Sequence, residues 1–215
     1  MEYENIKGVI INAEDIKRVE KAHSVTSFDL LWISERDEFE QRSDPEDIAA
    51  FVYSEAKKLG ADALFEAGVQ HYNGTGVPMR REAAITYFIM AAELGHIKAM
   101  VNAAMMFMNG DGVERNYWEA YFWFWNAMMK RDARAVYFLG DFYMNGYGVV
   151  NVNHAQAADY YEISAQVGHS VSQFNLGVMM FKGDGVPKDE EAGVMLISKA
   201  ADAGFKPAMQ VLGRE

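Results

Sequence analysis

Glycine pairs of the form G-x-G are the residues of this sequence that most suggest ligand chemistry, because such loops can cradle a phosphate with backbone N–H groups. The chain contains four of them, each followed by valine: NGTGV at 73–77, NGDGV at 109–113, NGYGV at 145–149 and KGDGV at 182–186. A phosphate loop would also need a preceding strand and a lysine after the glycines. Because neither accompanies these pairs, we interpret them as turns in which glycine supplies a positive φ at the end of a helix.

Histidine, cysteine and serine are the other residue types that could form a catalytic or metal-binding pattern. The chain has no cysteine, which excludes disulfides, thiolate zinc sites and cysteine nucleophiles. No serine lies in a G-x-S-x-G setting, and the histidines form neither an H-x-x-x-H motif nor a carboxylate–histidine cluster. We therefore predict no catalytic residue, no metal and no cofactor. The histidines are His23, His71, His96, His154 and His169.

The glycine pairs recur with a period of 36 to 37 residues, and other positions keep the same period. Each repeat contains two helical patterns, such as ARAVYFLGDFYMN (133–145) and REAAITYFIMAAEL (81–94). Small residues on one face of each pattern allow close packing of a neighbouring helix. A pair of antiparallel helices cannot bury its apolar faces alone, so each pair is expected to stack on the next. The sequence thus predicts an all-α solenoid with four repeats: 62–97, 98–133, 134–170 and 171–206.

The second helix of each repeat is expected to begin with its own cap. Asn116 with Glu119 and Asn153 with Gln156 match the spacing of a capping box, and Asp189 is a favourable N-cap residue. The valine after each glycine pair is expected to pack into the core and to hold the turn in place.

The repeat resembles the Sel1-like repeat, a relative of the tetratricopeptide repeat. The pattern A-x-x-x-L-G-x-x-Y-x-x-G-x-G-V is followed closely in the third repeat, by Ala135, Leu139, Gly140, Tyr143, Gly146, Gly148 and Val149. Repeat one departs from it at Ala67 and His71, and His71 is therefore expected to be a core residue. The resemblance implies a right-handed α-solenoid that acts as an adaptor or assembly scaffold.

Both ends of the chain depart from the repeat. Residues 1–61 are predicted to form an N-terminal cap with a degenerate helical repeat, and any strand is expected near Val9–Ile11. Residues 207–215 are predicted to form a partial capping helix.

Charge and hydropathy restrict the class of partner. The net charge of −11, from 31 acidic and 20 basic residues, disfavours a nucleic acid and would steer a basic protein toward the chain. No run approaches the ~18 apolar residues of a membrane span. The N-terminus carries acids where a signal peptide needs bases. We therefore expect a cytoplasmic protein that does not contact a membrane.

A concave groove is the predicted binding surface. In the related tetratricopeptide fold, certain first-helix positions line the groove, and carried over by register they form a strip rich in methionine and aromatic residues. Such a strip is typical of an interaction site. The residues are Phe65, Val69, Tyr72, Asn73, Val101, Met105, Met108, Asn109, Tyr137, Asp141, Met144, Asn145, Phe174, Val178, Phe181 and Lys182.

The stretch NYWEAYFWFWNAMM (116–129) carries aromatic residues all round one helix, so they cannot share one face. Trp123 and Phe124 match packing positions. Tyr121, Phe122 and Trp125 either pack against neighbouring helices or form a convex aromatic patch that anchors a partner or a second copy of the chain.

These observations predict a non-catalytic scaffold that binds a protein partner through its groove. Small bacterial members of the family that resemble immunity proteins or antitoxins suggest a basic toxin domain as that partner, and a signalling protein is the other candidate. One alternative is a β-lactam hydrolase, as associated with some cysteine-rich secreted members. The other is a homo-oligomeric assembly protein.

Overall fold

The computed structural model describes residues 58–214, so the predictions for the N-terminal cap and the strand near Val9–Ile11 lie outside the described residues. The described residues contain helices and turns and no strand, which confirms the all-α fold class. Eight helices have 13 residues each, and a shorter helix follows them. Their bounds are α5 Ala61–Asn73, α6 Arg81–Glu93, α7 Ile97–Asn109, α8 Tyr117–Met129, α9 Ala133–Asn145, α10 His154–Gln166, α11 Ser170–Lys182, α12 Glu190–Asp202 and α13 Lys206–Val211.

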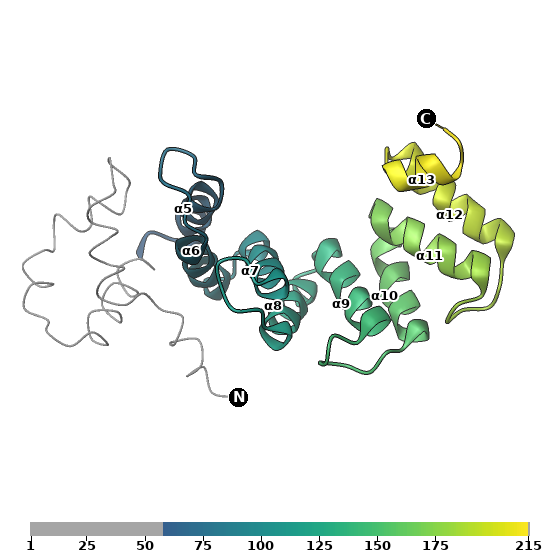
Figure 1. Ribbon diagram of the computed structural model, residues 1–215, viewed down its shortest axis with the longest axis horizontal. Coiled ribbons are helices and arrows are strands. Elements are labelled where there is room, and N and C mark those ends of the chain that lie inside the picture. Colours follow the sequence, from purple (N-terminus) through teal and green to yellow (C-terminus); the bar gives the residue numbers. More distant parts are fainter. Residues whose placement is uncertain (1–57, 215) are drawn as a thin grey trace, which may run out of the picture. The chain divides into compact units, whose positions relative to one another are not determined.

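The chain divides into two compact units, whose helices are labelled in Figure 1. The N-terminal unit ends at Asn116 and contains α5, α6 and α7, and the C-terminal unit begins at Tyr117 and contains α8 to α13. Within each unit, every helix packs against the next one along the chain. Both units therefore use the same construction, in which a first helix (α5, α7, α9, α11) alternates with a second helix (α6, α8, α10, α12).

The glycine turns end the first helices, as the sequence predicts. Gly110 has a φ of 72° and Gly112 a φ of 73°, so both occupy the left-handed region that glycine favours. The backbone N–H groups of Gly110 and Asp111 both donate to the carbonyl oxygen of Met106, at 2.9 and 3.0 Å. These bonds satisfy a carbonyl that the helix end would otherwise leave unpaired. Of the valines that follow the glycine pairs, Val77 is buried at 8% exposure, as predicted for all four, and the other three are half-buried: Val113, Val149 and Val186.

The residue between the two glycines joins each turn to the preceding repeat. In three repeats this residue contacts the first residue of the preceding second helix, 30 positions earlier in the chain. One contact is an ion pair and another is a hydrogen bond of a histidine ring, each with an N–O distance of 2.5 Å, and the third is a pair of stacked rings 5.0 Å apart. The G-x-G turn is therefore a link between repeats as well as a helix end. The pairs are Arg81–Asp111, Tyr117–Tyr147 and His154–Asp184.

Glycines inside the first helices allow the second helices to approach. A Cβ atom added at Gly68 would lie 2.7 Å from the ring of Phe88, and one at Gly140 would lie 2.7 Å from the ring of Tyr161. Both rings are about 1% exposed. The small residue on one helix and the large ring on the next thus fill the same space within each helix pair.

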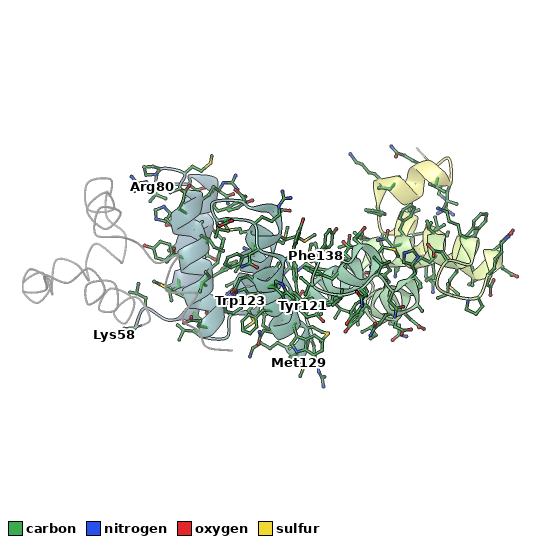
Figure 2. The ribbon with its side chains drawn as sticks, turned by 60° about the horizontal axis from the view of Figure 1, so that its bottom comes forward. Lys58, Arg80, Tyr121, Trp123, Met129 and Phe138 are labelled. Atoms are coloured by element: carbon green, nitrogen blue, oxygen red, sulfur yellow. The ribbon has the colours of Figure 1, made fainter. Side chains whose placement is uncertain are left out.

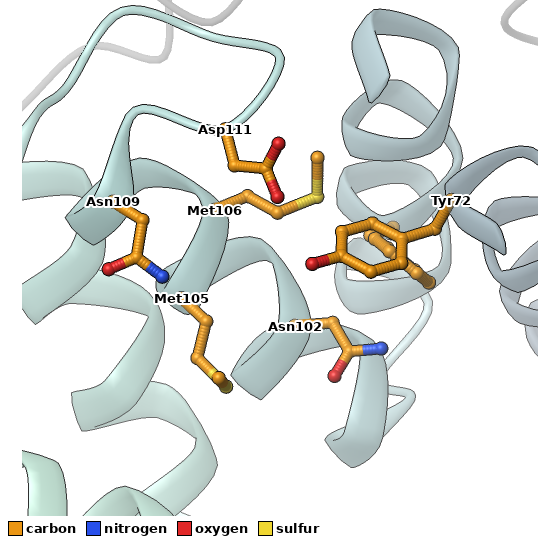
Figure 3. A pocket seen from close by; sticks show the side chains of 7 residues that line it. Tyr72, Asn102, Met105, Met106, Asn109 and Asp111 are labelled. Atoms are coloured by element: carbon orange, nitrogen blue, oxygen red, sulfur yellow. The ribbon is translucent and has the colours of Figure 1, made fainter. Parts of the chain in front are cut away.

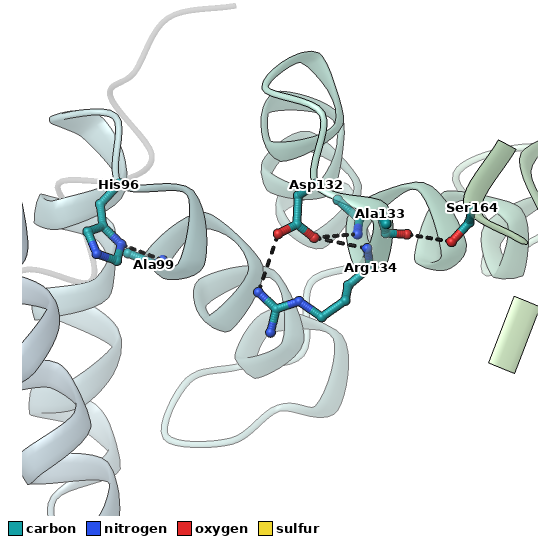
Figure 4. A network of polar contacts seen from close by, with 7 residues as sticks. His96, Ala99, Asp132, Ala133, Arg134 and Ser164 are labelled. Atoms are coloured by element: carbon teal, nitrogen blue, oxygen red, sulfur yellow. Dashed lines mark hydrogen bonds and ion pairs between the residues drawn. The ribbon is translucent and has the colours of Figure 1, made fainter. Parts of the chain in front are cut away.

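Helix caps fix where several helices begin. Asn153 accepts a hydrogen bond from the N–H of Gln156 at 3.1 Å and Asp189 accepts one from the N–H of Ala192 at 2.9 Å, which confirms two of the three predicted caps; the cap at Asn116 stays a prediction. Asp132 accepts from the N–H groups of Arg134 and Ala135 at the start of α9 (Figure 4). These bonds satisfy N–H groups that have no partner within the helix.

Candidate functional site

A pocket of about 180 Å³ opens on the first helices of the N-terminal unit (Figure 3). Its walls combine two aromatic rings, two methionines, two amides and a carboxylate. The hydroxyl end of Tyr72 points into the pocket from α5, and the side chains from α7 face it. The lining residues are Tyr72, Phe88, Asn102, Met105, Met106, Asn109 and Asp111.

Arg81 holds one rim of the pocket in place. Its guanidinium lies 3.8 Å from the centre of the Tyr72 ring and forms an ion pair with Asp111 at 2.5 Å. Both charged side chains are about one-third exposed, so water screens the pair and its own contribution to stability is modest. Arg81 matters to the pocket because it holds the ring of Tyr72 and the carboxylate of Asp111 on the same rim.

Three of the predicted groove residues line this pocket, namely Tyr72, Met105 and Asn109. Val101 does not, and the prediction that it lines the groove is wrong, since it is 0% exposed and belongs to the core. Asn102, which was not predicted, takes its place. Asn102, Met105 and Asn109 follow the spacing i, i+3, i+7 of one helix face, and this spacing could have identified Asn102.

Phe65, Tyr137 and Phe174 occupy one position of the repeat, and all three are half-buried. Each ring contacts the residue that precedes the next first helix or the terminal helix α13. The contacts are Phe65–His96 with centroids 4.2 Å apart, Tyr137–His169 at 5.1 Å and Phe174–Phe205 at 5.5 Å. These three aromatic residues therefore join neighbouring repeats, in addition to any part that they take in binding.

In the C-terminal unit, Asp141 on α9 has a half-buried carboxyl group. The hydroxyl of Tyr161 donates to Asp141 at 2.5 Å. Burial raises the pKa of Asp141, and hydrogen bonds from Tyr161 and Tyr137 oppose part of that rise. Burial likewise raises the pKa of both tyrosines, so their hydroxyls keep their protons. No basic side chain of the described residues is among the groups that shift the pKa of this carboxyl.

The other predicted groove residues differ in exposure. Asn73, Asn145, Phe181 and Lys182 are exposed, and the amide of Asn145 donates to the carbonyl oxygen of Asp141 at 2.9 Å. The remaining four are half-buried: Val69, Met108, Met144 and Val178.

On α8, the structure separates packing from exposed aromatic residues. Trp123 and Phe124 are buried, and Tyr121 packs its ring against Phe142 with centroids 5.3 Å apart. Phe122 and Trp125 remain 39% and 41% exposed. Two further apolar side chains that were not predicted are exposed on this helix, Trp118 at 62% and Met129 at 68%, and Met129 projects from its end (Figure 2).

Two histidines of the described residues take part in packing or helix capping. His71 is buried and stacks on Tyr87, in line with its predicted core position. His96 caps α7, where its Nδ1 accepts from the N–H of Ala99 at 3.1 Å (Figure 4). Within residues 58–214, no group of three or more histidine, aspartate or glutamate side chains is placed to hold a metal ion.

The helices of the described part are also too short and too polar to cross a bilayer, since a span needs about 20 mainly apolar residues.

Comparison with known proteins assigns the repeat. The Sel1 repeat model matches residues 61–96, 97–124, 133–169 and 170–205. An ERAD-associated E3 ubiquitin-protein ligase component, HRD3B of Arabidopsis thaliana, is 34% identical over 46% of this chain and 15% of its own length. An exopolysaccharide production negative regulator of Rhizobium leguminosarum bv. viciae is 27% identical over 74% of this chain and 62% of its own.

The chain therefore spans less than two-thirds of the length of either relative. Among solved structures, a Sel1 repeat protein from Oxalobacter formigenes superposes with a TM-score of 0.67 at 25% identity, over 75% of this chain and 69% of the other. The predicted solenoid class is confirmed by this likeness, and the four matched repeats, which cover most of the chain, show that it belongs to the Sel1 repeat family.

Proposed function

We propose that this chain is a non-catalytic scaffold that binds a protein partner through its first-helix surface, meaning the exposed and half-buried groove residues of α5 and α7 in the N-terminal unit and those of α9 and α11 in the C-terminal unit, each unit being considered by itself. The observation that carries the proposal is the pocket beside Tyr72, Met105 and Asn109. Sel1 repeats mediate protein–protein binding, and members of the family are mostly non-catalytic adaptors, which supports the same conclusion.

The pocket suits an apolar side chain from an extended segment of the partner. Phe88, Met105 and Met106 supply apolar walls, and methionine adapts to the shape of what it contacts. The amides of Asn102 and Asn109 can donate to and accept from a peptide backbone. Apolar walls with a few polar groups at the rim are the usual composition of a binding pocket.

Asp141 adds a preference for a basic residue in the partner. Its carboxylate is half-buried, and the groups that hold it are tyrosine hydroxyls rather than a cation. An arginine or lysine of the partner would supply the missing positive charge beside the rings of Tyr137 and Tyr161. A basic toxin domain is one protein that would meet this requirement, and its neutralisation stays a hypothesis within the proposed binding function.

The test is site-specific cross-linking in the native host. A photo-reactive amino acid is placed at Met105 in one variant and, as a control, at Ile163 in another, because Ile163 is an exposed apolar residue of the second helix α10. We expect one protein to cross-link at Met105 and not at Ile163. The purified partner should then bind Met105→Ala at least tenfold more weakly than the wild type, mainly through faster dissociation.

Two outcomes would overturn the proposal. In the first, the partner cross-links at Ile163 and not at Met105, which places the binding surface on the second helices. In the second, a correctly folded Met105→Ala/Asn109→Ala variant binds the partner as tightly as the wild type does.

A further inference from the structure

Helix α8 presents a continuous apolar stripe to solvent. The stripe consists of Trp118, Phe122, Trp125 and Met129, which are 62%, 39%, 41% and 68% exposed. Their spacing of four, three and four residues averages about 3.7, close to the 3.6 residues of one helical turn, and this keeps all four on one side of the helix. Scattered single apolar residues on a surface are ordinary, but four in register on one helix mark an interaction surface.

The repeat itself does not require this stripe. The equivalent positions of α10 are occupied by Ala155, Asp159, Glu162 and Gln166, all exposed. In α12 they are occupied by Glu191, Met195, Ser198 and Asp202. The other second helices of the C-terminal unit thus carry mainly polar residues where α8 carries two tryptophans, a phenylalanine and a methionine, whereas in α6 the equivalent Thr86 and Ile89 are buried. The stripe is a property of α8 and calls for a cause other than folding of the repeat.

A backbone irregularity lies at the C-terminal end of the stripe. Arg131 has a φ of 67°, whereas the equivalent position in the other repeats is glycine: Gly95, Gly168 and Gly204. A non-glycine residue in the left-handed region costs about 1 kcal/mol or more. Glycine would avoid this cost, so Arg131 places an exposed guanidinium after the end of the stripe in spite of local strain.

The stripe is complementary to itself in an antiparallel arrangement. Its spacing reads the same from either end, so an antiparallel second α8 would place Trp118 opposite Met129 of the second copy and Phe122 opposite its Trp125. Charge follows the same symmetry. Glu119 lies in the first turn of α8, and Lys130 and Arg131 follow its last turn. Antiparallel pairing brings the basic end of each helix level with the acidic end of the other.

We propose that this stripe is the contact surface of a homodimer, in which α8 packs antiparallel against α8 of a second copy around a two-fold axis. A two-fold interface needs one self-complementary patch, and the stripe with its charged ends is such a patch. The inference concerns α8 alone and does not depend on binding at the first-helix surface.

The exposed area of the stripe limits the area that the dimer can bury. From side-chain areas of about 150–250 Å², the four exposed fractions amount to on the order of 400 Å² per copy. A pair would bury on the order of 800 Å² from the stripe alone, below the ~1,200 Å² at which specific stable interfaces begin. We therefore expect a reversible dimer rather than an obligate one.

Sedimentation of the full chain from low to several hundred micromolar tests the dimer. The wild type should shift from monomer to dimer. Met129→Glu, which alters the most exposed member of the stripe, should weaken association at least tenfold without unfolding the chain. Ile163→Glu, a matched apolar-to-acidic change on α10, should leave association unchanged. A wild type that stays monomeric throughout overturns the proposal, as does a dimer that Ile163→Glu dissociates and Met129→Glu does not.

The antiparallel geometry has its own test, because the chain has no cysteine of its own. A mixture of Trp118→Cys and Met129→Cys chains should form a disulfide-linked heterodimer under mild oxidation, and neither variant should link to itself. Self-linked Met129→Cys dimers without the heterodimer would overturn the antiparallel model.

The Arg131→Gly variant distinguishes a role of Arg131 in dimerisation from a role in folding. Glycine relieves the positive φ, so this variant should melt at the same temperature as the wild type or higher while its dimer weakens several-fold. If Arg131→Gly lowers the melting temperature and leaves dimerisation unchanged, the arginine serves folding and the charge complementarity is wrong.

Discussion

At the scale of single residues, Asp141 has the environment most sensitive to pH. Its carboxyl lies among Tyr137, Tyr147 and Tyr161, and burial raises its pKa above the ordinary value of about 3.9. A carboxyl whose pKa is higher in the folded state binds its proton more tightly there than in the unfolded chain. Its contribution to the free energy of unfolding is therefore most favourable below about pH 3.9 and is lost as pH rises through the folded-state pKa.

Replacing Asp141 with asparagine should remove this pH dependence. Asparagine keeps an oxygen that can accept from Tyr161 and carries no charge, so at pH 7 the variant should be as stable as the wild type or more stable. The difference in unfolding free energy should move in favour of the wild type as pH falls toward 4. Denaturant unfolding followed by circular dichroism at pH 4.5 and pH 7 measures it.

Asp159→Asn is the control for that experiment, because Asp159 is an exposed acid on α10. Its effect should be small at both pH values. If Asp141→Asn destabilises the chain more at pH 7 than at pH 4.5, the charged carboxylate stabilises the fold and the assignment of desolvation as its main influence is wrong.

At the scale of the element, the two glycines of the G-x-G turn have different structural roles, although the sequence alone does not distinguish them. Its first glycine ends a helix, and its second can approach the preceding repeat. A Cβ atom at Gly112 would lie 2.4 Å from the carbonyl carbon of Arg81, whereas one at Gly148 would meet nothing within 4 Å. The two glycines have nearly the same φ, 73° and 74°. A substitution at each of the two glycines therefore distinguishes the cost of backbone strain from the cost of steric crowding.

Gly148→Ala should cost about 1 kcal/mol, from placing a side chain in the left-handed region. Gly112→Ala should cost about 2–4 kcal/mol, because overpacking against the backbone at Arg81 adds to that strain. Thermal and urea unfolding of the two variants measures the difference. Equal costs would mean that the turn shifts freely and is not held against the preceding repeat.

Added nucleotide should leave the melting temperature of the wild type unchanged, because the glycine turns are not phosphate-binding loops. A nucleotide-dependent rise in the melting temperature of the wild type that is absent from Gly112→Ala would identify a ligand site instead.

At the scale of the whole molecule, charge governs how a partner arrives. The net charge of −11 creates a negative potential around the chain that attracts a basic protein over distances longer than any contact. Salt screens such attraction within about 10 Å at 0.1 M, but it affects desolvated contacts much less. Long-range charge and short-range packing should therefore influence different rate constants.

Raising the salt concentration from 50 to 500 mM should slow association with the cross-linked partner by about tenfold or more and change dissociation little. Met105→Ala should show the opposite pattern, with faster dissociation and an unchanged salt dependence of association. Stopped-flow or surface-binding kinetics separates the two rates. An association rate that is indifferent to salt would mean that the acidic surface serves solubility and does not steer the partner.

The sequence by itself determined the helical repeat, because the features that specify it are local. The positive φ of Gly110 and Gly112 follows from the helix end at which they lie, and the caps at Asn153 and Asp189 need only residues three positions away. Periodicity of small residues likewise predicts which helices pair. Each of these features depends on neighbours in the chain, so a single sequence is enough to read them.

Only the tertiary structure decided which side of a first helix is accessible and what covers the rest. Val101 is buried while Asn102 lines the pocket, although the two are adjacent in the sequence. The link between Arg81 and Asp111 joins residues 30 positions apart. The exposure of Trp118 and Met129 likewise depends on which helices lie beside α8. Burial and long-range contact arise from surfaces supplied by other repeats, and no window of sequence around one residue contains those surfaces.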